Sequence, residues 1–406
     1  MSSVDIKKND SGWKNGMAKN ITFIVTKDCQ LACKYCYLVG KNEKERMSWD
    51  IAQKAIDYIL DHEDDMREEN VVWDFIGGEP FLEIDLIDQI CDYLKVEMYK
   101  RNHHWFNSYR FSFSTNGINY DSEKVQRFIK KNRDHISIGI TIDGTEVKHD
   151  LNRIYKETGK GSYKSVVRNI PLWIEQFPYA STKVTISSPD IPYIKESVLH
   201  LYSLGIKEVN INCVFEDVWK EGDDKLLEDQ LMKLADAIIE NDLYKENACS
   251  FYSESIGKPL DSKLENTNWC GAGRMLAVDA NGIFYPCTRF AQYSLRNKSA
   301  WTIGNIRDGI DKNKLRPFLA LDRLSQSKQE CIDCEVASGC AWCQGENYDA
   351  AETNTIYQRS TAICKMHKAR VRANNYYWNK LYRKLELEGM REEFEKTKKE
   401  SKDIIC

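Results

Sequence analysis

Ten of the fourteen cysteines fall into two groups whose spacing is typical of metal ligands. The first group, Cys29, Cys33 and Cys36, has the spacing C-x3-C-x2-C and directly follows a β-branched run at residues 21–25. Three thiolates can hold three irons of a 4Fe-4S cluster and leave the fourth iron open, whereas a structural zinc site takes four ligands. Because the nearest histidine is His62, the sequence favours a cluster with an open iron over zinc.

A second group of seven cysteines lies in the last third of the chain. Its centre has the spacing C-x2-C-x5-C-x2-C, so a pair of zinc knuckles is an alternative to iron–sulfur ligands. Clustered thiols at such short spacing indicate metal or cluster ligands rather than disulfides. The seven members are Cys270, Cys287, Cys331, Cys334, Cys340, Cys343 and Cys364.

Composition excludes several other classes of function. The formal net charge of the 406 residues is -4, which gives no support for binding nucleic acid or an acidic membrane surface. The apolar runs are a handful of residues long, too short to span a bilayer. Residues 1–20 are polar and lack the apolar core of a secretory signal, so we expect a cytoplasmic protein with reduced thiols.

Strand and helix patterns alternate along the first part of the chain. Repeated β-α units with chemistry-bearing residues after the strands predict an α/β fold, a partial (β/α)6 TIM-like barrel followed by a small Cys-rich domain. The expected strands are residues 21–25, 71–76, 109–114, 136–142, 183–186 and 209–214. One expected helix begins after a cap at Ser48. Three others are expected over residues 84–101, 126–132 and 195–204.

Five segments are expected in order along the chain. They are an N-terminal tail (1–20), the barrel (21–246), a polar linker (247–268), the Cys-rich domain (269–367) and a charged helical extension (368–406). We expect residues 372–387 to pack back on the core and residues 391–402 to be a solvated face or a frayed tail.

The cysteine motif itself carries a family resemblance. The segment Cys29-Gln30-Leu31-Ala32-Cys33-Lys34-Tyr35-Cys36 resembles the signature of the radical S-adenosylmethionine (SAM) superfamily. The resemblance implies that SAM binds the open iron and is cleaved to methionine and a 5′-deoxyadenosyl radical. It also implies that Tyr35, in the aromatic position before the last cysteine, lies near the adenine.

Three later strand ends extend this resemblance over roughly the first 240 residues. Residues 77–80 resemble the family's glycine-glycine-glutamate-proline motif at the SAM amino group, where glycine lets backbone approach a ligand closely. Residues 113–117 and 140–144 match the next two strand ends, although each alone is also consistent with a plain turn. Arg153 resembles the arginine that holds the SAM carboxylate. The implied SAM-contacting residues are Tyr35, Gly77, Gly78, Glu79, Pro80, Ser114, Asn116, Asp143 and Arg153.

The second cysteine group resembles the SPASM domain, a seven-cysteine module that follows radical SAM barrels in peptide-modifying enzymes. The spacing before the sixth cysteine is two residues here, where the family usually has three. The resemblance implies two auxiliary clusters and therefore three 4Fe-4S clusters in all. The outer cluster would use Cys331, Cys334, Cys340 and Cys364, and the inner one Cys270, Cys287 and Cys343.

Two features favour a thioether-forming peptide maturase within this group. Sulfatase-maturating members have an eighth cysteine just before the first, but residues 264–268 contain none and Cys249 lies further upstream. They also carry a catalytic aspartate after the second cysteine, where this chain has Thr288. Residues 285–290 resemble thioether-forming maturases, and residues 21–47 resemble the CXXX-repeat, freyrasin type. The implied partners are a Cys-rich precursor peptide, whose thiolate can occupy an iron of the inner cluster, and a one-electron donor such as flavodoxin or ferredoxin.

Three alternatives remain open from the sequence. One is formylglycine formation on a sulfatase, another is carbon–carbon crosslinking of a peptide, and the last is a non-catalytic iron–sulfur scaffold, which the intact SAM-contact series disfavours. Only about 20 residues precede the first strand, so no N-terminal leader-binding module is expected. Cys91 and Cys213 lie in a predicted helix and strand and are interpreted as inert core residues.

Overall fold

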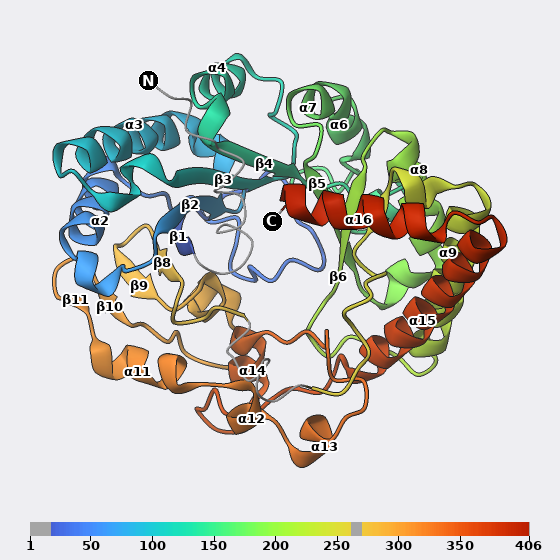
Figure 1. Cartoon of the computed structure of the whole chain (residues 1–406). Coiled ribbons are helices and arrows are strands. Elements are labelled where there is room, and N and C mark those ends of the chain that lie inside the picture. Colours follow the sequence, from blue (N-terminus) through green and yellow to red (C-terminus); the bar gives the residue numbers. More distant parts are fainter. Residues whose placement is uncertain (1–17, 261–269, 406) are drawn as a thin grey trace.

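The computed structural model describes residues 18–260 and 270–405 (Figure 1). Parallel pairing joins the first four strands in chain order and the next two in a second sheet, and a parallel bridge between Thr141 and Lys183 connects the two sheets. The predicted strands are confirmed, with ends that differ by a few residues. They are β1 (Ala18–Thr26), β2 (Asn70–Gly77), β3 (Tyr109–Thr115), β4 (Ile136–Ile140), β5 (Ser181–Ile186) and β6 (Glu208–Cys213).

Helices cover the outer face of these strands. Phe111 and Phe113 of β3 are buried on that side, and the Phe113 ring packs edge-on against Phe128 of α4 at 5.6 Å. Ser112 and Ser114 alternate with them and face inward. The helices are α2 (Trp49–Asp61), α3 (Ile84–Lys100), α4 (Glu123–Lys131), α5 (Glu146–Asn152), α6 (Tyr163–Val167), α7 (Ile170–Gln176), α8 (Ile194–Ser203) and α9 (Asp223–Glu240).

Some helices were predicted correctly from the sequence, and others were missed. The Ser48 hydroxyl accepts the Ile51 amide at 3.3 Å, which confirms the predicted cap of α2. No element was predicted over α9, an 18-residue helix rich in charge. Its buried residues, among them Leu227, Leu231 and Leu234, recur at helical spacing, and this was the signal that could have revealed it.

The Cys-rich part continues the barrel sheet. Strand β8 (Leu276–Val278) pairs in parallel with β1, with Ile21 opposite Leu276 and Phe23 opposite Val278. Antiparallel β9 (Ile283–Tyr285), β10 (Gly304–Asn305) and β11 (Gly309–Ile310) follow. On the other side of the fold, β7 (Ala248–Cys249) pairs with β6, although residues 247–268 were expected to be a linker. The remaining helices before the C-terminal extension are α11 (Lys312–Ala320), α12 (Arg323–Gln326), α13 (Gln329–Ile332) and α14 (Gln344–Ala350).

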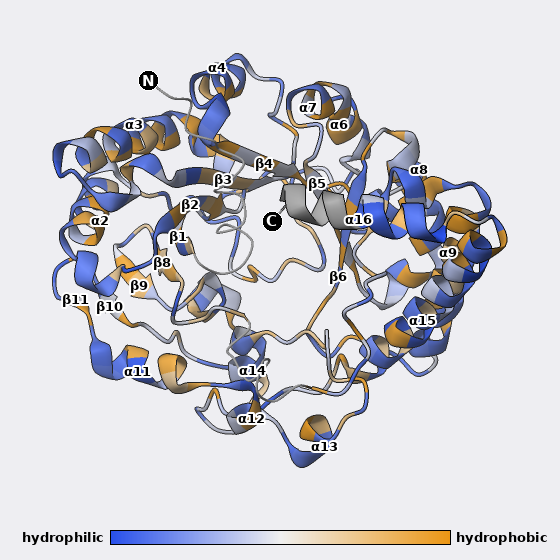
Figure 2. Cartoon of the chain, in the orientation of Figure 1, coloured by the Kyte–Doolittle hydropathy of each residue, from blue (hydrophilic) through white to orange (hydrophobic). Residues whose placement is uncertain are grey.

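The C-terminal extension is helical, as predicted. Helix α15 (Cys364–Leu387) packs along α9, and its Tyr376 hydroxyl donates to Asp236 at 2.7 Å. Helix α16 (Arg391–Ile405) is mostly hydrophilic in Figure 2, but Phe394 packs against the Tyr244 ring at 5.9 Å. Within the described part of the chain, no helix has the length and apolar character needed to cross a bilayer.

The end of β2 lies directly against the loop that carries the first cysteines. The Gly78 amide donates to the Thr26 carbonyl at 3.0 Å, and the Glu79 amide donates to the Asp28 carbonyl at 2.9 Å. A Cβ on Gly77 would overlap the Thr26 carbonyl oxygen, and one on Gly78 would overlap the Asp28 carbonyl oxygen. The neighbouring backbone therefore requires glycine at both positions. The sequence predicted only that glycine there lets backbone approach a ligand.

We expect Gly78→Ala to lower the free energy of unfolding by about 1–3 kcal/mol, because the backbone at Asp28 has to move. Gly139→Ala is the matched control, since its Cβ would meet Ser181 at an ordinary 3.5 Å, and it should change stability by less than about 0.5 kcal/mol. Urea unfolding of both variants measures the difference. Equal effects of the two substitutions would show that the close approach is unimportant.

Candidate functional site

The loop with Cys29, Cys33 and Cys36 leaves the end of β1 and is held by the segment that follows α5. The Ala32 amide donates to the Ile154 carbonyl at 2.8 Å, and the Lys34 amide donates to the Asn152 carbonyl at 3.1 Å. These backbone bonds fix the loop at the same edge of the barrel as the other predicted strand ends.

The thiols of this loop lie in a largely protein-lined environment. Cys29 is buried, and its sulfur accepts the Leu31 amide at 3.3 Å, whereas Cys33 and Cys36 are half-buried. Burial, followed by the charge of Glu79, raises the pKa of Cys29 to about 12, and Cys33 is near enough to add to the shift. A thiol coordinated to a metal loses its proton despite such a shift, so this donor set fits a metal cluster.

Three residues predicted from separate motifs meet beside these thiols. The Tyr35 hydroxyl donates to the Asp143 carboxylate and accepts from the Arg153 guanidinium at 3.0 Å. Although burial acts to raise the pKa of Asp143, the charges of Lys148 and Arg153 hold it below its usual value. Asp143 is therefore an anion that orients both Tyr35 and Arg153.

Arg153 also has capacity for a ligand. The residue is 6% exposed, and its Nε has no hydrogen-bond partner. A buried, unpaired guanidinium N–H is costly unless an acceptor fills the site, and a carboxylate is the acceptor that arginine suits best. The residues present thus fit the carboxylate of SAM.

Hydrogen bonds join the ends of β2 and β3 to each other. The buried Glu79 carboxylate accepts the Thr115 hydroxyl at 2.6 Å, the Asn116 amide at 2.7 Å and the Phe81 amide at 3.1 Å. Its carboxylate therefore joins β2 to β3 within the protein. The Asn116 side chain donates to Gln30 at 3.0 Å, which adds a link to the cysteine loop.

The two remaining predicted contacts have different surroundings. Pro80 is buried at the start of a short 3-10 helix (Pro80–Glu83). The Ser114 hydroxyl, on the inward face of β3, accepts Lys183 of β5 at 2.7 Å. Ser114 thus already has a protein partner on the inward face.

A fully buried ion pair supports the site from behind. Lys148 of α5 lies 3.6 Å from Asp190, and both side chains have no exposed area. Asp190 also accepts the Asn152 side chain at 2.7 Å, and Asn152 is the residue whose carbonyl binds the cysteine loop. This network fixes α5, from whose end Arg153 extends.

The structure brings together the three cysteines of the expected inner set. The thiols of Cys270, Cys287 and Cys343 act on one another electrostatically, and burial raises the pKa of Cys270 to about 11. Cys249 is on β7, where Arg370 is the charged group that influences it, and it is not among the neighbours that shift the inner thiols. The inner set therefore contributes three thiols among the described residues.

The four cysteines of the expected outer set are also neighbours. Cys331 and Cys340 each act electrostatically with Cys364, and Cys334 is near Cys331. Positive charge surrounds them, because Arg359 donates to the Cys340 sulfur at 3.1 Å. None of the thirteen cysteines that the structure describes forms a disulfide.

The segment that follows Cys36 packs against residues that follow Cys287. Tyr37 is hydrogen-bonded to Thr288, and both Cys36 and Cys287 contribute to its raised pKa of about 12, after burial as the main cause. Gly40 donates its amide to the Tyr293 carbonyl at 3.0 Å, and a Cβ on Gly40 would lie 2.9 Å from that of Tyr293. The segment after Cys36 is therefore, with the β1–β8 pairing, one of the surfaces against which the Cys-rich part packs.

Sequence reasoning missed a buried charge cluster at this junction. Arg289 donates to Glu216, beyond β6, at 2.9 Å and to Glu346 of α14 at 3.2 Å. Burial and the charge of Glu216 raise the pKa of Glu346 to about 7. The three residues are far apart in sequence and belong to no short motif, so only the fold reveals them.

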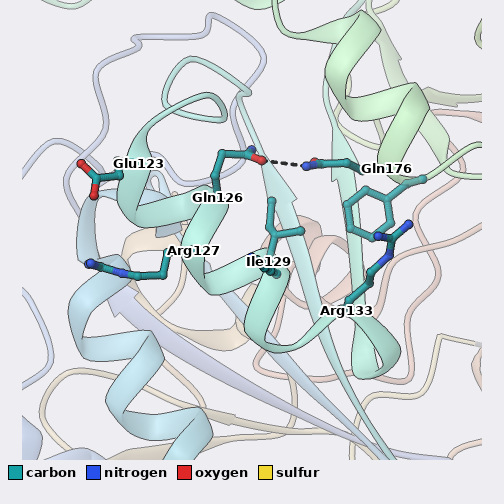
Figure 3. A pocket seen from close by; sticks show the side chains of 8 residues that line it. Glu123, Gln126, Arg127, Ile129, Arg133 and Gln176 are labelled. Carbon is teal, nitrogen blue, oxygen red and sulfur yellow. Dashed lines mark hydrogen bonds between the residues drawn. The ribbon is translucent and has the colours of Figure 1, made fainter.

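Two other features lie away from this site. A pocket of about 520 Å³ beside α4 contains Gln126, which accepts Gln176 at 2.7 Å, and it includes none of the predicted residues (Figure 3). Glu63, His103 and His104 are close enough to hold a metal ion. However, His103 Nδ1 accepts the Trp105 amide, so the proton of the neutral ring is on Nε2. A protonated nitrogen has no lone pair with which to coordinate a metal ion.

Comparison with known proteins agrees with this arrangement. Residues 23–193 match the family described as the radical SAM superfamily. This chain contains a radical SAM domain. A radical SAM domain implies SAM and one 4Fe-4S cluster, for which the cysteine loop and Arg153 provide fitting donors.

The radical SAM chain is similar to several curated proteins. It is 32% identical over 204 residues, 48% of this chain and 63% of the other, to an uncharacterized protein of Methanocaldococcus jannaschii. It therefore spans less than two thirds of that relative's length. It is 22% identical over 341 residues, 77% of this chain and 78% of the other, to a serine-type anaerobic sulfatase-maturating enzyme of Bacteroides thetaiotaomicron.

Solved structures share the radical SAM fold over most of the chain. Native anSMEcpe with bound AdoMet and Cp18Cys peptide has a TM-score of 0.66 at 19% identity, covering 90% of this chain and 98% of that one. Streptococcus suis SuiB bound to precursor peptide SuiA has a TM-score of 0.57 at 14% identity, covering 85% and 75%. The α/β fold predicted from the sequence is confirmed.

A buried histidine at the SAM site predicts loss of stability in acid. His149 Nδ1 accepts the Asp143 amide at 3.2 Å, and burial lowers its pKa to about 3. Because the unfolded chain binds the proton more tightly, stability falls as the pH drops from about 6.5 toward 3, by up to about 1.4 kcal/mol per unit.

The corresponding experiment is urea unfolding of His149→Gln and the parent between about pH 5 and 6.5. The parent should lose stability more steeply than the variant over this interval. His103→Gln should flatten the profile in the same direction, since burial lowers the pKa of His103 to about 4. Identical slopes in the parent and His149→Gln would contradict the assignment.

Proposed function

We propose that this radical SAM protein is a peptide maturase that forms thioether crosslinks between a cysteine sulfur and a carbon of a ribosomally made precursor peptide. One observation carries the proposal. The three thiols Cys270, Cys287 and Cys343 are neighbours, and Tyr37, which follows Cys36, is near enough to Cys287 for both of these thiols to raise its pKa. The loop proposed to carry the radical-generating cluster and the proposed inner set therefore both lie near Tyr37.

The proposed ligand sets follow the neighbouring thiols. Cys29, Cys33 and Cys36 would hold the SAM-cleaving cluster, and the two later sets would hold auxiliary clusters, making three 4Fe-4S clusters. SAM bound at the first cluster supplies a 5′-deoxyadenosyl radical that abstracts hydrogen from unactivated carbon. Arg153 binds the SAM carboxylate through its unpaired Nε, and Asp143 keeps Arg153 and Tyr35 in place. A one-electron donor of the flavodoxin or ferredoxin type would supply the electron for SAM cleavage.

A peptide substrate is supported by the proteins of similar fold. SuiB has been solved with its precursor peptide SuiA, and anSMEcpe with a Cp18Cys peptide. In each crosslink the peptide would lose one hydrogen from carbon and one proton from the thiol, and the remaining electron would pass to an auxiliary cluster. Three thiols in the inner set leave one iron of a four-iron cluster for the substrate sulfur.

Formylglycine formation on a sulfatase peptide is the second candidate. The similarity to a sulfatase-maturating enzyme over 77% of the chain favours it. Against it, Thr288 occupies the position of that group's aspartate, and its neighbour Arg289 is bound to two glutamates. Thr288 cannot accept a proton as a carboxylate does.

Iron content tests the cluster assignment. Anaerobically reconstituted protein should bind about twelve irons per chain. Replacing Cys29, Cys33 and Cys36 by alanine should lower this by about four irons and abolish release of 5′-deoxyadenosine from SAM. The matched control is Cys91→Ala, a buried helix thiol, which should retain both the iron and the cleavage activity. Continued 5′-deoxyadenosine release by the triple variant would exclude these residues as ligands of the active cluster.

Mass spectrometry of a Cys-containing precursor peptide tests the reaction. Each crosslink should make the peptide lighter by about 2 Da, and a Cys-to-Ser peptide should remain unchanged. Cys249→Ala should retain activity, because Cys249 lies apart from the inner thiols. Equal modification of the serine peptide would exclude thioether formation, and formylglycine on a sulfatase peptide would establish the second candidate instead.

A further inference from the structure

Arg289 occupies a position where three distant parts of the chain meet. Its guanidinium lies 5.0 Å from the centre of the Tyr37 ring, on the first cysteine loop. It also binds Glu216, which follows β6, and Glu346 of α14. Gly345 has no side chain because a Cβ there would overlap the Arg289 Cβ, so α14 packs closely on this residue.

The Arg289 charge acts on the inner thiols. Arg289 is two residues after Cys287, and it is hydrogen-bonded to Glu346, three residues after Cys343, so its charge lies near both thiols. The Arg289 side chain is only 13% exposed, so solvent screens this charge weakly. A guanidinium also stays protonated throughout the accessible pH range.

We propose that Arg289 is a positioning residue that sets the redox potential of the group held by Cys270, Cys287 and Cys343, with Glu216 and Glu346 opposing its charge. The inference rests on the proposed function, because it requires these thiols to hold an iron–sulfur cluster. A cluster that gains an electron becomes more negative, so a fixed positive charge beside its ligands favours reduction and raises the potential. Arg289 would thereby make the inner cluster a better acceptor for the electron that crosslinking leaves behind.

The two glutamates should affect the cluster potential in the opposite direction to Arg289. Glu216 and Glu346 are both buried and share the same Arg289 nitrogen. Removing either carboxylate leaves the arginine charge less compensated. Arg289→Gln and Glu346→Gln should therefore move the potential in opposite directions, which an effect on folding alone would not produce.

The experiment is an EPR-monitored titration with dithionite of reconstituted full-length protein in which Cys29, Cys33 and Cys36 are alanine, so that only the auxiliary clusters report. Arg289→Gln should make the inner cluster harder to reduce by on the order of tenfold, about 59 mV for one electron. Glu346→Gln, measured near pH 8 where Glu346 is ionised, should make it easier to reduce. Arg289→Lys should keep most of the parent potential.

Arg296→Gln is the matched control, since Arg296 pairs with Glu216 at 3.6 Å but its side chain is 44% exposed. It should shift the potential much less than Arg289→Gln does. An unchanged potential in Arg289→Gln with full iron content would overturn this inference but leave the proposed function standing. The same holds if Arg289→Gln loses inner-cluster iron and Arg289→Lys retains it, because Arg289 would then be needed to hold the cluster. If the parent chain binds only about four irons, the proposed clusters are absent and the inference fails with them.

Discussion

Strand β1 is hydrogen-bonded on both of its edges, and the relative position of all the cysteine sets depends on this pairing. On one edge β2 continues the barrel, and on the other β8 brings in the Cys-rich part. The first cysteine loop leaves from the end of the same strand. Ladder pairing fixes register along a strand, so the two cysteine regions cannot slide against each other without breaking the sheet.

At the strand ends, buried carboxylates perform most of the positioning. Glu79 joins β2 to β3, Asp143 orients Tyr35 and Arg153, and Asp190 holds α5 through Lys148 and Asn152. Each carboxylate is satisfied by several donors, which is the condition under which burying its charge is tolerated. The predicted SAM site is therefore held in place by buried groups that bind one another.

Much of the fold and part of the site follow from the sequence. Short apolar runs that alternate with helix patterns identified β1 to β6, and motif spacing selected Tyr35, Asp143 and Arg153, which the structure brings together. Three things did not follow. Helix α9 was missed because its charge obscured its apolar stripe, and the backbone packing that requires glycine at 77 and 78 was not anticipated. Glu216, Arg289 and Glu346 meet only through tertiary packing, so no local pattern could announce them.

The contact between Gly40 and Tyr293 has a consequence for biosynthesis. Tyr293, which packs on the first cysteine loop, is translated long after Gly40. At about 5–20 residues per second, the thiols of this loop remain uncovered for an interval on the order of tens of seconds. During that time they are open to oxidation and to adventitious metals, so the nascent chain depends on a reducing environment until its last third has been made.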